Sequence, residues 1–243
     1  MGAGVIVLAG GSGSRMGGSD RSAAPDSKVF AMVEGRPLLS FSLEVCALAP
    51  SVTACVVVAR EGDTARVRAI AASVPGLEVV VVTGGATRFA SEVAGLEALR
   101  DTALGGDIDT IAIHDAARPF ATIQLFEEVI AAARRFGGAV PGVVFVEPVI
   151  DTSGSAPLQR PGVEVAKMQT PQAFQCRYLY EAYTASIPDQ GAADTAETVE
   201  RLGDVPIAVV AGDLRNLKVT FPRDLDRAAT LALLWRDGSW TAG

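Results

Sequence analysis

Glycines and two cations follow the first apolar run of the chain. Gly4–Ala9 leads into Gly10–Gly17, which carries Arg15, and Lys28 comes after this loop. Closely spaced glycines let backbone N–H groups approach phosphate oxygens, because no Cβ stands in the way. An NAD fingerprint would need glycine where Met16 stands, and a Walker loop would end in a lysine that is missing here. The pattern favours a nucleoside triphosphate over a dinucleotide; the alternative is a tight turn whose cations are merely solvated.

A second candidate cluster ends the fourth apolar run, in the string His114-Asp115-Ala116-Ala117-Arg118-Pro119. At the carboxyl end of a strand, the Asp115 carboxylate is able to bind a divalent cation or ribose hydroxyls. Arg118 is able to bind a phosphate through two parallel N–H···O hydrogen bonds. The alternative is an ion pair between Asp115 and Arg118 that closes a turn. His114 is the single histidine, which disfavours a His-based triad or a zinc site. For His114 we expect a core or hydrogen-bonding role.

Short apolar runs alternate with amphipathic segments, and this alternation sets the expected fold. Strands are expected at Gly4–Ala9, Thr53–Ala59, Glu78–Thr83, Thr110–Ile113, Gly138–Val146, Val163–Met168, Ile207–Ala211 and Leu217–Thr220. Helices are expected after Pro37, from Asp63 to Val74, from Arg88, from Thr122, and over Tyr178–Ala185, Thr195–Leu202 and Pro222–Trp235. The pattern predicts one α/β domain over 1–243, Rossmann-like, with a mostly parallel wound sheet, helices on both faces, and a frayed tail at about 236–243.

Ligands of such sheets bind beyond the carboxyl ends of the strands. Three segments of the chain follow predicted strands and carry polar or glycine-rich patterns: Gly10–Lys28, Gly84–Ser91 and His114–Arg118. We therefore expect these three segments to converge on one site.

Composition narrows the function classes. The 243 residues include 21 Lys+Arg against 28 Asp+Glu, a net charge of −7, and 49% are hydrophobic, which excludes a disordered chain. The acidic balance argues against a nucleic-acid partner. No signal peptide is evident, and no apolar stretch nears the roughly 18 residues that a membrane span requires. Three cysteines without CxxC spacing argue against a zinc ribbon or a disulfide framework and favour a cytoplasmic protein.

Several strings together carry a resemblance to a known family. They occur in one order, as Leu8-Ala9-Gly10-Gly11-Ser12-Gly13-Ser14-Arg15-Met16, Ser27-Lys28, Gly84-Gly85-Ala86-Thr87-Arg88 with Ser91, His114 to Pro119, Gln169-Thr170-Pro171-Gln172, and Asn216-Leu217-Lys218-Val219-Thr220. The chain resembles the 2-C-methyl-D-erythritol 4-phosphate cytidylyltransferases, and also the sister ribitol-5-phosphate cytidylyltransferases, from about Val5 to Leu234. The histidine-containing and Gln-Thr-Pro-Gln strings are specific, whereas many sugar nucleotidyltransferases share the glycine-rich loop.

The resemblance implies a reaction of CTP with a polyol phosphate that gives a CDP-polyol and pyrophosphate, with Mg²⁺, in a homodimer. It implies that the CTP phosphates are bound by Ala9, Gly10, Gly11, Ser12 and Gly13. It implies that Arg15 and Lys28 stabilise the reacting phosphorus, that Gly85 and Ser91 read the cytosine edge, and that Asp115 and Ala116 face ribose and metal. It implies that Arg118, Lys218 and Asp194 serve the acceptor, with Lys218 also near the α-phosphate. A short β-arm is implied at about 145–170.

Two departures from the family pattern lie in the nucleotide loop. Leu8-Ala9-Gly10-Gly11 stands where methylerythritol enzymes usually read Pro-Ala-Ala-Gly, and it is more like the ribitol branch. The stretch from Met16 to Lys28 is longer than usual, which leaves the position of Lys28 open.

Two further departures lie on the acceptor side. Ser153–Met168 is shorter than the arm that normally lends an arginine to the partner subunit, for which Arg160 is a possible substitute. Ala193 precedes Asp194 where the family has threonine. These departures leave the acceptor open: 2-C-methyl-D-erythritol 4-phosphate is favoured by the His-Asp-Ala-Ala-Arg string, and ribitol 5-phosphate is the alternative. A non-catalytic nucleotide-binding paralogue is disfavoured because a sensor would not need the acceptor-side cations.

Overall fold

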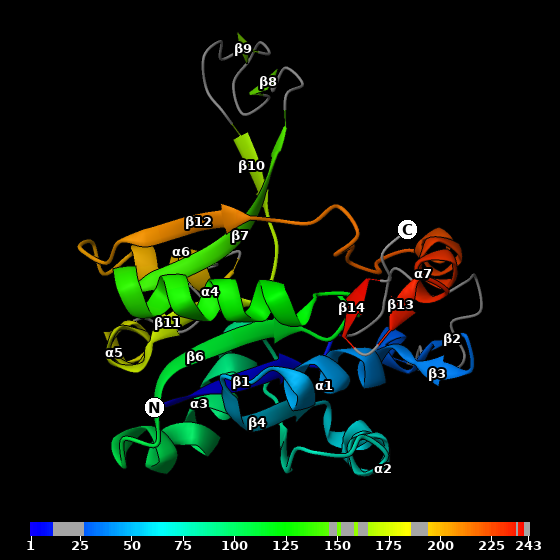
Figure 1. The fold of residues 1–243 in the computed structure, drawn as a ribbon. Coiled ribbons are helices and arrows are strands. Elements are labelled where there is room, and N and C mark those ends of the chain that lie inside the picture. Colours follow the sequence, from blue (N-terminus) through cyan, green and yellow to red (C-terminus); the bar gives the residue numbers. More distant parts are fainter. Residues whose placement is uncertain are drawn as a thin grey trace.

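The computed structural model describes residues 1–11, 27–145, 150–151, 158–159, 165–185, 194–236 and 238–240. At its centre is an eight-stranded sheet in the order β10-β7-β11-β6-β1-β4-β5, with β12 paired to β7 (Figure 1). Its strands are β1 (Gly2–Leu8), β4 (Val52–Ala59), β5 (Val79–Thr83), β6 (Ile108–Asp115), β7 (Gly138–Phe145), β10 (Val165–Met168), β11 (Gln172–Gln175) and β12 (Ile207–Ala211). Parallel pairing joins β1 to β4 and β6, β4 to β5, and β7 to β12, while β10 and β11 run antiparallel to their neighbours.

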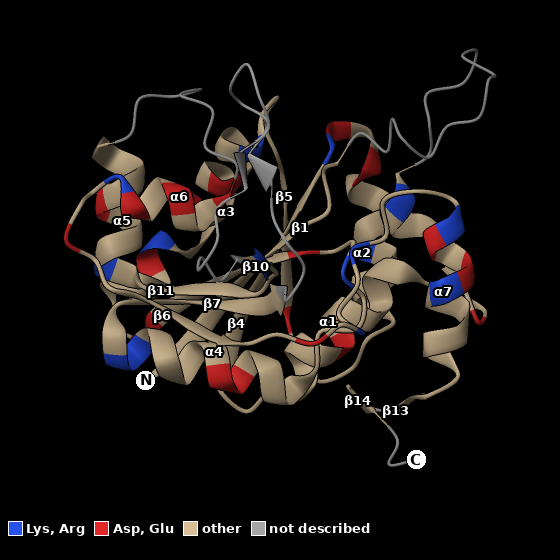
Figure 2. Ribbon diagram, turned by 90° about the horizontal axis from the view of Figure 1, so that it is seen from above, with Lys and Arg blue, Asp and Glu red and all other residues tan. Residues whose placement is uncertain are grey.

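Helices cover both faces of this sheet. They are α1 (Leu38–Leu48), α2 (Thr64–Ala72), α3 (Arg88–Leu104), α4 (Ile123–Phe136), α5 (Cys176–Ala185), α6 (Thr195–Glu200) and α7 (Arg223–Ala232), with short 3₁₀ turns at Lys28–Phe30 and Glu61–Asp63. Figure 2 shows α1 and α4 on one side of the strands and α3, α5 and α6 on the other. The predicted fold class, a mostly parallel wound α/β sheet between helices, is confirmed.

Strand alternation divides the core into two halves. In β1, Val5 and Val7 pack with Phe41 of α1 and Phe126 of α4, whereas Ile6 between them packs with Leu96 of α3 on the opposite face. Successive side chains of a strand point to opposite faces, so a strand buried on both faces needs apolar residues at consecutive positions. This is why β1 and β4 are unbroken apolar runs in the sequence. None of the helices that the structure describes is both long and apolar enough to cross a bilayer.

Three small two-stranded sheets complete the described chain. They are β2 (Met32–Val33) with β3 (Arg36–Pro37), β8 (Ile150–Asp151) with β9 (Leu158–Gln159), and β13 (Trp235–Arg236) with β14 (Ser239–Trp240). The expected arm at about 145–170 lies partly outside the described residues. Of its described parts, β7 and β10 pair and rise out of the body of the molecule, with β8 and β9 beyond them (Figure 1).

The chain end differs from its prediction. The closing helix ends at Ala232, short of Trp235. The sequence predicts fraying from residue 236 onwards, but the β13–β14 pair brings the Trp235 and Trp240 rings within 5.0 Å of each other and both against Phe120. Burial of aromatic surface is what orders a terminal segment that carries two tryptophans.

Three other local features differ from what the sequence led us to expect. Gln172–Gln175 is an antiparallel strand, β11, that enters between β6 and β7; its four residues are too few for a pattern to reveal. Leu217–Thr220 is not a strand, although the Val219 N–H donates to the Ala117 carbonyl at 2.8 Å. At α2, Asp63 stands before the helix as expected, yet its carboxylate accepts from Arg60 Nε at 2.7 Å and makes no capping bond.

Candidate active site

A cavity of about 350 Å³ lies at the carboxyl ends of β1, β5 and β6. The three predicted segments converge there: Gly10 and Gly11 follow β1, Gly85 and Ser91 follow β5, and Asp115 ends β6. Lys28 and Lys218 line the same cavity. A larger cavity of about 690 Å³, at the amino end of β6, is mostly apolar and contains none of the candidate residues. The chemistry-bearing motifs thus mark the smaller, polar cavity as the candidate site.

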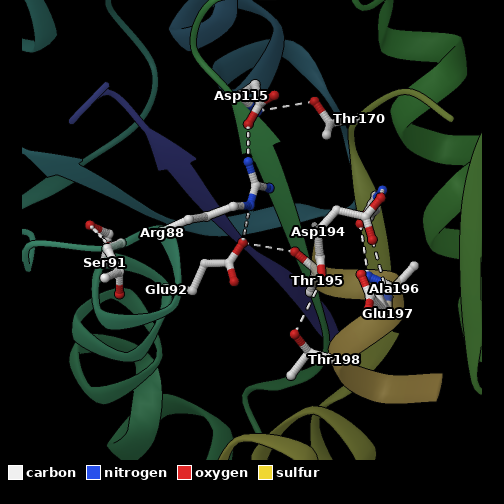
Figure 3. Close-up of polar contacts among 12 residues, drawn as sticks. Arg88, Ser91, Glu92, Asp115, Thr170, Asp194, Thr195, Ala196, Glu197 and Thr198 are labelled. Atoms are coloured by element: carbon white, nitrogen blue, oxygen red, sulfur yellow. Dashed lines mark hydrogen bonds and ion pairs between the residues drawn. The ribbon is translucent and has the colours of Figure 1, made fainter. Parts of the chain in front are cut away.

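Asp115 is held between two cations at the centre of this cavity. Its Oδ1 lies 2.7 Å from Arg88 Nη1 and its Oδ2 lies 2.6 Å from Lys218 Nζ, while its N–H donates to Thr170 Oγ1 at 3.0 Å. Figure 3 shows Arg88 and Thr170 reaching Asp115 from separate elements. Burial opposes ionisation of Asp115, but Arg88 and Lys218 outweigh burial and hold the pKa of the carboxyl below its ordinary value. Asp115 is therefore an ionised acceptor, suited to receive hydrogen bonds from hydroxyl groups.

His114 lies behind Asp115, fully buried, as the sequence led us to expect. Its Nε2 lies 3.1 Å from the Arg118 carbonyl and its Nδ1 lies 3.1 Å from Thr170 Oγ1. A carbonyl oxygen only accepts, so Nε2 carries the proton and Nδ1 accepts from the threonine hydroxyl. Burial lowers the pKa of His114 to about 4, so the ring is neutral near neutral pH. Its role is to fix the turn below Asp115.

The sequence segments on which the family resemblance rests are hydrogen-bonded to one another in the interior. Arg118 donates from Nη1 to the Asn216 carbonyl at 2.8 Å, and Asn216 Nδ2 donates to the Thr170 carbonyl at 3.0 Å. Gln169 Nε2 donates to the Asp213 carbonyl at 2.7 Å. These bonds join segments that are far apart in the sequence and present Lys218 to the cavity from a loop.

Several predicted residues are placed away from the cavity wall. Arg118 is only 6% exposed and binds main-chain carbonyls. Ala9 and Ala116 are buried, and their N–H groups donate to the carbonyls of Val58 and Leu8, respectively. Asp194 caps α6, accepting from the Glu197 N–H at 3.1 Å and from Gln172 Nε2 at 3.0 Å. Ser12, Gly13, Arg15, Arg160 and Ala193 lie outside the described residues.

The turn that leads into α3 requires glycine for a steric reason. A Cβ on Gly85 would lie 2.4 Å from the Ala90 Cβ, and one on Gly84 would lie 2.7 Å from Ser91 Oγ. Both approaches are shorter than side-chain carbons tolerate, so the helix start packs directly on bare backbone. Ser91 lines the cavity, and its Oγ donates to the Thr87 carbonyl at 2.9 Å, so its lone pairs remain available as acceptors.

Sequence reasoning missed two functional candidates in α3. The sequence gives no direct sign of the role of Arg88, although it is a cation that follows a strand and lies near the predicted anion Asp115. Glu92 was not singled out, although an acid four residues after an arginine faces it on a helix. Arg88 and Glu92 form an ion pair with Nε and Oε1 2.8 Å apart, and burial raises the pKa of Glu92.

The described residues contain no group of three or more His, Cys, Asp or Glu side chains placed to hold a metal. Within the described part of the cavity lining, Asp115 is the one carboxylate, and both of its oxygens already meet cations. One carboxylate cannot complete the coordination of a metal ion by itself. It does suit Mg²⁺ already bound to the phosphates of a substrate, because Mg²⁺ is commonly coordinated by one or two carboxylates together with substrate phosphates.

Comparison with known proteins identifies the family. Residues 3–233 match the family model described as 2-C-methyl-D-erythritol 4-phosphate cytidylyltransferase. The chain is 34% identical over 232 residues to the enzyme of that name from Solibacter usitatus, covering 92% of this chain and 93% of the relative.

Solved structures agree with this match. One is the 2-C-methyl-D-erythritol 4-phosphate cytidylyltransferase from Thermus thermophilus, at 31% identity and a TM-score of 0.71, covering 96% of this chain and 100% of that one. Another is the 4-diphosphocytidyl-2C-methyl-D-erythritol synthase from Anaerococcus prevotii, at 26% identity and a TM-score of 0.79, covering 96% of both chains. The chain therefore belongs to the 2-C-methyl-D-erythritol 4-phosphate cytidylyltransferase family and is a nucleotidyltransferase.

Proposed function

We propose that the cavity around Asp115 binds CTP and that this chain transfers its cytidylyl group to 2-C-methyl-D-erythritol 4-phosphate, a step toward isoprenoid precursors. Cytidylyl transfer is the activity of the family to which the chain belongs. The observation that carries the assignment to this cavity is the ionised Asp115 between Arg88 and Lys218, at the sheet edge where the glycine segments meet. The relatives named above carry the methylerythritol name, which favours that acceptor over ribitol 5-phosphate.

The chemistry needs positioning and charge rather than a base or a nucleophile. The acceptor is already a phosphate anion near neutral pH, so its oxygen attacks the α-phosphorus of CTP directly and pyrophosphate leaves on the opposite side. Two polyanions must be brought together, and cations stabilise the equatorial charge that grows at phosphorus. Lys28 and Lys218 line the cavity and are suited to this task. Arg15, in the glycine-rich loop, is proposed as a third such cation on the family pattern.

We assign the remaining contacts from the same placement. Backbone N–H groups of Gly10 and Gly11 face the triphosphate, Gly85 and Ser91 face the base, and the Asp115 carboxylate accepts from ribose hydroxyls. Asp115 is also the residue that would contact Mg²⁺ carried by the CTP phosphates. When bound, the metal would neutralise phosphate charge; the residues of the chain orient the two substrates.

One assay tests the function. The purified protein is incubated with CTP, Mg²⁺ and a panel that includes 2-C-methyl-D-erythritol 4-phosphate and ribitol 5-phosphate, and pyrophosphate release is followed. Release with the methylerythritol acceptor at the highest kcat/KM is the expected result. A preference for ribitol 5-phosphate would move the chain to the alternative acceptor.

Nucleotide choice is a first prediction. A pyrimidine pocket lined by Gly85, Ala86 and Ser91 reads the amino edge of cytosine through polar groups of the turn and excludes purines by size. An unmet buried polar group costs about 1–3 kcal/mol, so kcat/KM for CTP should exceed that for UTP and ATP by about tenfold or more. The three nucleotides are compared at fixed acceptor concentration. Equal turnover with ATP would contradict the assignment of the pocket.

We also propose a homodimer that forms through the projecting strands. Val144 of β7, Met168 of β10 and Val209 of β12 are 54%, 41% and 63% exposed, on neighbouring strands at one end of the sheet. Two-fold dimers are the commonest assembly of soluble chains, and an exposed apolar patch of this kind is suited to a second copy.

The dimer is a second prediction. Sedimentation should show a two-chain species, and specific activity should fall as the protein is diluted through dissociation. Val209→Asp should weaken association, whereas Val80→Asp, at a comparably exposed site on the opposite edge strand β5, should not. A monomer with full specific activity would show that each chain holds a complete site.

A further inference from the structure

A buried carboxylate lies directly behind the candidate site. Glu92 is on α3, one helical turn after Arg88, and is only 2% exposed. Its Oε1 lies 2.8 Å from Arg88 Nε, and the Nη1 of the same guanidinium lies 2.7 Å from Asp115 Oδ1. Arg88 thus lies between two carboxylates: its Nε is ion-paired with Glu92, and its Nη1 donates a hydrogen bond to Asp115.

Two hydroxyl groups hold Glu92 in turn. Thr195 Oγ1 donates to Glu92 Oε1 at 2.9 Å, and the Tyr183 hydroxyl donates to Oε2. Thr195 is the fully buried first residue of α6, and Tyr183 belongs to α5. Figure 3 shows the resulting line of contacts from Thr195 through Glu92 and Arg88 to Asp115.

A carboxyl group buried this deeply beside a charged arginine is unusual. Burying a charge is costly unless it is paired and hydrogen-bonded, and an apolar residue would fill such a position at no electrostatic cost. Here the pairing partner is a cavity-lining arginine that is 29% exposed and also reaches Asp115. Asp115 and Glu92 together outweigh the effect of burial and raise the pKa of Arg88, so the guanidinium stays charged.

We propose that Glu92 is a positioning residue of the nucleotide site, which orients Arg88 so that Asp115 stands ready to receive the ribose of CTP. This inference rests on the proposed function. Through Thr195, Glu92 also ties the site to the start of α6, where Asp194 is the preceding residue. We define Glu92, Tyr183 and Thr195 as one buried cluster. This cluster joins the wall of the proposed CTP cavity to the segment expected to serve the acceptor.

The test variant is Glu92→Gln. Glutamine keeps the length of the side chain and an oxygen to accept one of the two hydroxyl donors, but it removes the carboxyl group that pairs with Arg88. We expect the KM for CTP and the Kd of CTP, measured by titration calorimetry without acceptor, to rise about tenfold or more, because small misplacement of supporting groups carries a large penalty. We expect kcat to change less than about threefold, since Glu92 does not touch the reacting atoms.

Matched variants separate positioning from simple support of the fold. Glu97→Gln removes a carboxylate from the same helix, where it pairs with the exposed Arg100, and should leave the Kd of CTP unchanged. Tyr183→Phe removes one hydrogen bond to Glu92 but keeps the ion pair with Arg88, and should change the Kd less than Glu92→Gln. Glu92→Ala combined with Thr195→Glu returns a carboxylate to the cluster from α6 and should recover a large part of the CTP affinity that Glu92→Ala alone loses.

The outcomes are distinguishable from a failure of the proposed function. If the wild type binds CTP but releases no pyrophosphate with any polyol phosphate, the acceptor assignment fails, while the Kd of CTP still tests Glu92. A folded Glu92→Gln protein with wild-type Kd and KM for CTP would overturn the inference. A Glu92→Gln protein that is less stable to heat but has unchanged CTP affinity would also overturn it, because that pattern shows a structural role alone.

Discussion

Replacing Lys218 with alanine is expected to lower kcat about 10²–10³-fold, while the affinity for CTP changes far less. Lys218 Nζ lies 2.6 Å from Asp115 Oδ2 in the cavity, and its side chain is 39% exposed, so the ammonium can exchange its carboxylate partner for a phosphate. Charge at phosphorus grows only on the way to the transition state. A cation placed there therefore stabilises the transition state more than the bound substrates.

The measurement is steady-state kinetics of the purified variants beside a thermal melt. Lys218→Arg should not restore turnover fully, because a planar guanidinium cannot occupy the place of a compact ammonium. Arg223→Ala, which removes an exposed cation at the start of α7 outside the cavity, is the matched control and should retain wild-type kcat. A Lys218→Ala protein that folds normally and turns over at the wild-type rate would remove Lys218 from the catalytic residues.

The free energy of unfolding is expected to fall by about 3 kcal/mol between pH 7 and pH 4 because of His114 alone. Burial lowers the pKa of this histidine from 6.5 to about 4 in the folded state. Between these two pH values the His114 side chain is protonated in the unfolded chain but not in the folded chain. Acidification therefore favours the unfolded state over this range, and the lost stability is regained as the pH rises from about 4 to 6.5, above which it is fully present.

Chemical denaturation at pH 7 and at pH 4 measures this effect against a control variant. His114→Gln removes the titrating ring but keeps a nitrogen that is able to donate to the Arg118 carbonyl, the contact that His114 Nε2 makes. The loss of unfolding free energy on acidification should be about 3 kcal/mol smaller in this variant than in the wild type. Parallel losses in the two proteins would show that other groups produce the acid sensitivity.

Much of the architecture is readable from local patterns. The runs Gly4–Ala9 and Thr53–Ala59 are apolar at consecutive positions because both of their faces are covered, and β1 and β4 lie within a residue or two of these predictions. Helices α3 and α4 begin within a residue of the expected Arg88 and Thr122, and the threonine before each helix accepts from a backbone N–H. Such features depend on neighbours a few positions away, and a sequence displays those neighbours directly.

The sequence alone also determined which edge of the sheet carries the candidate site. Glycine-rich turns and polar residues follow β1, β5 and β6, and parallel strands bring their carboxyl ends to one edge. The ordered strings were specific enough to point to the family that the comparisons identify.

Only the tertiary structure decided which partners these residues meet. Arg88 and Lys218 lie 27 and 103 positions from Asp115 in the sequence, so no short-range sequence pattern predicts that both contact it. Arg118 is drawn inward by main-chain carbonyls, and β11 enters the sheet antiparallel because pairing with β6 and β7 satisfies its backbone groups. Each of these outcomes is set by the balance of burial and long-range hydrogen bonding, which exists only once the chain has folded.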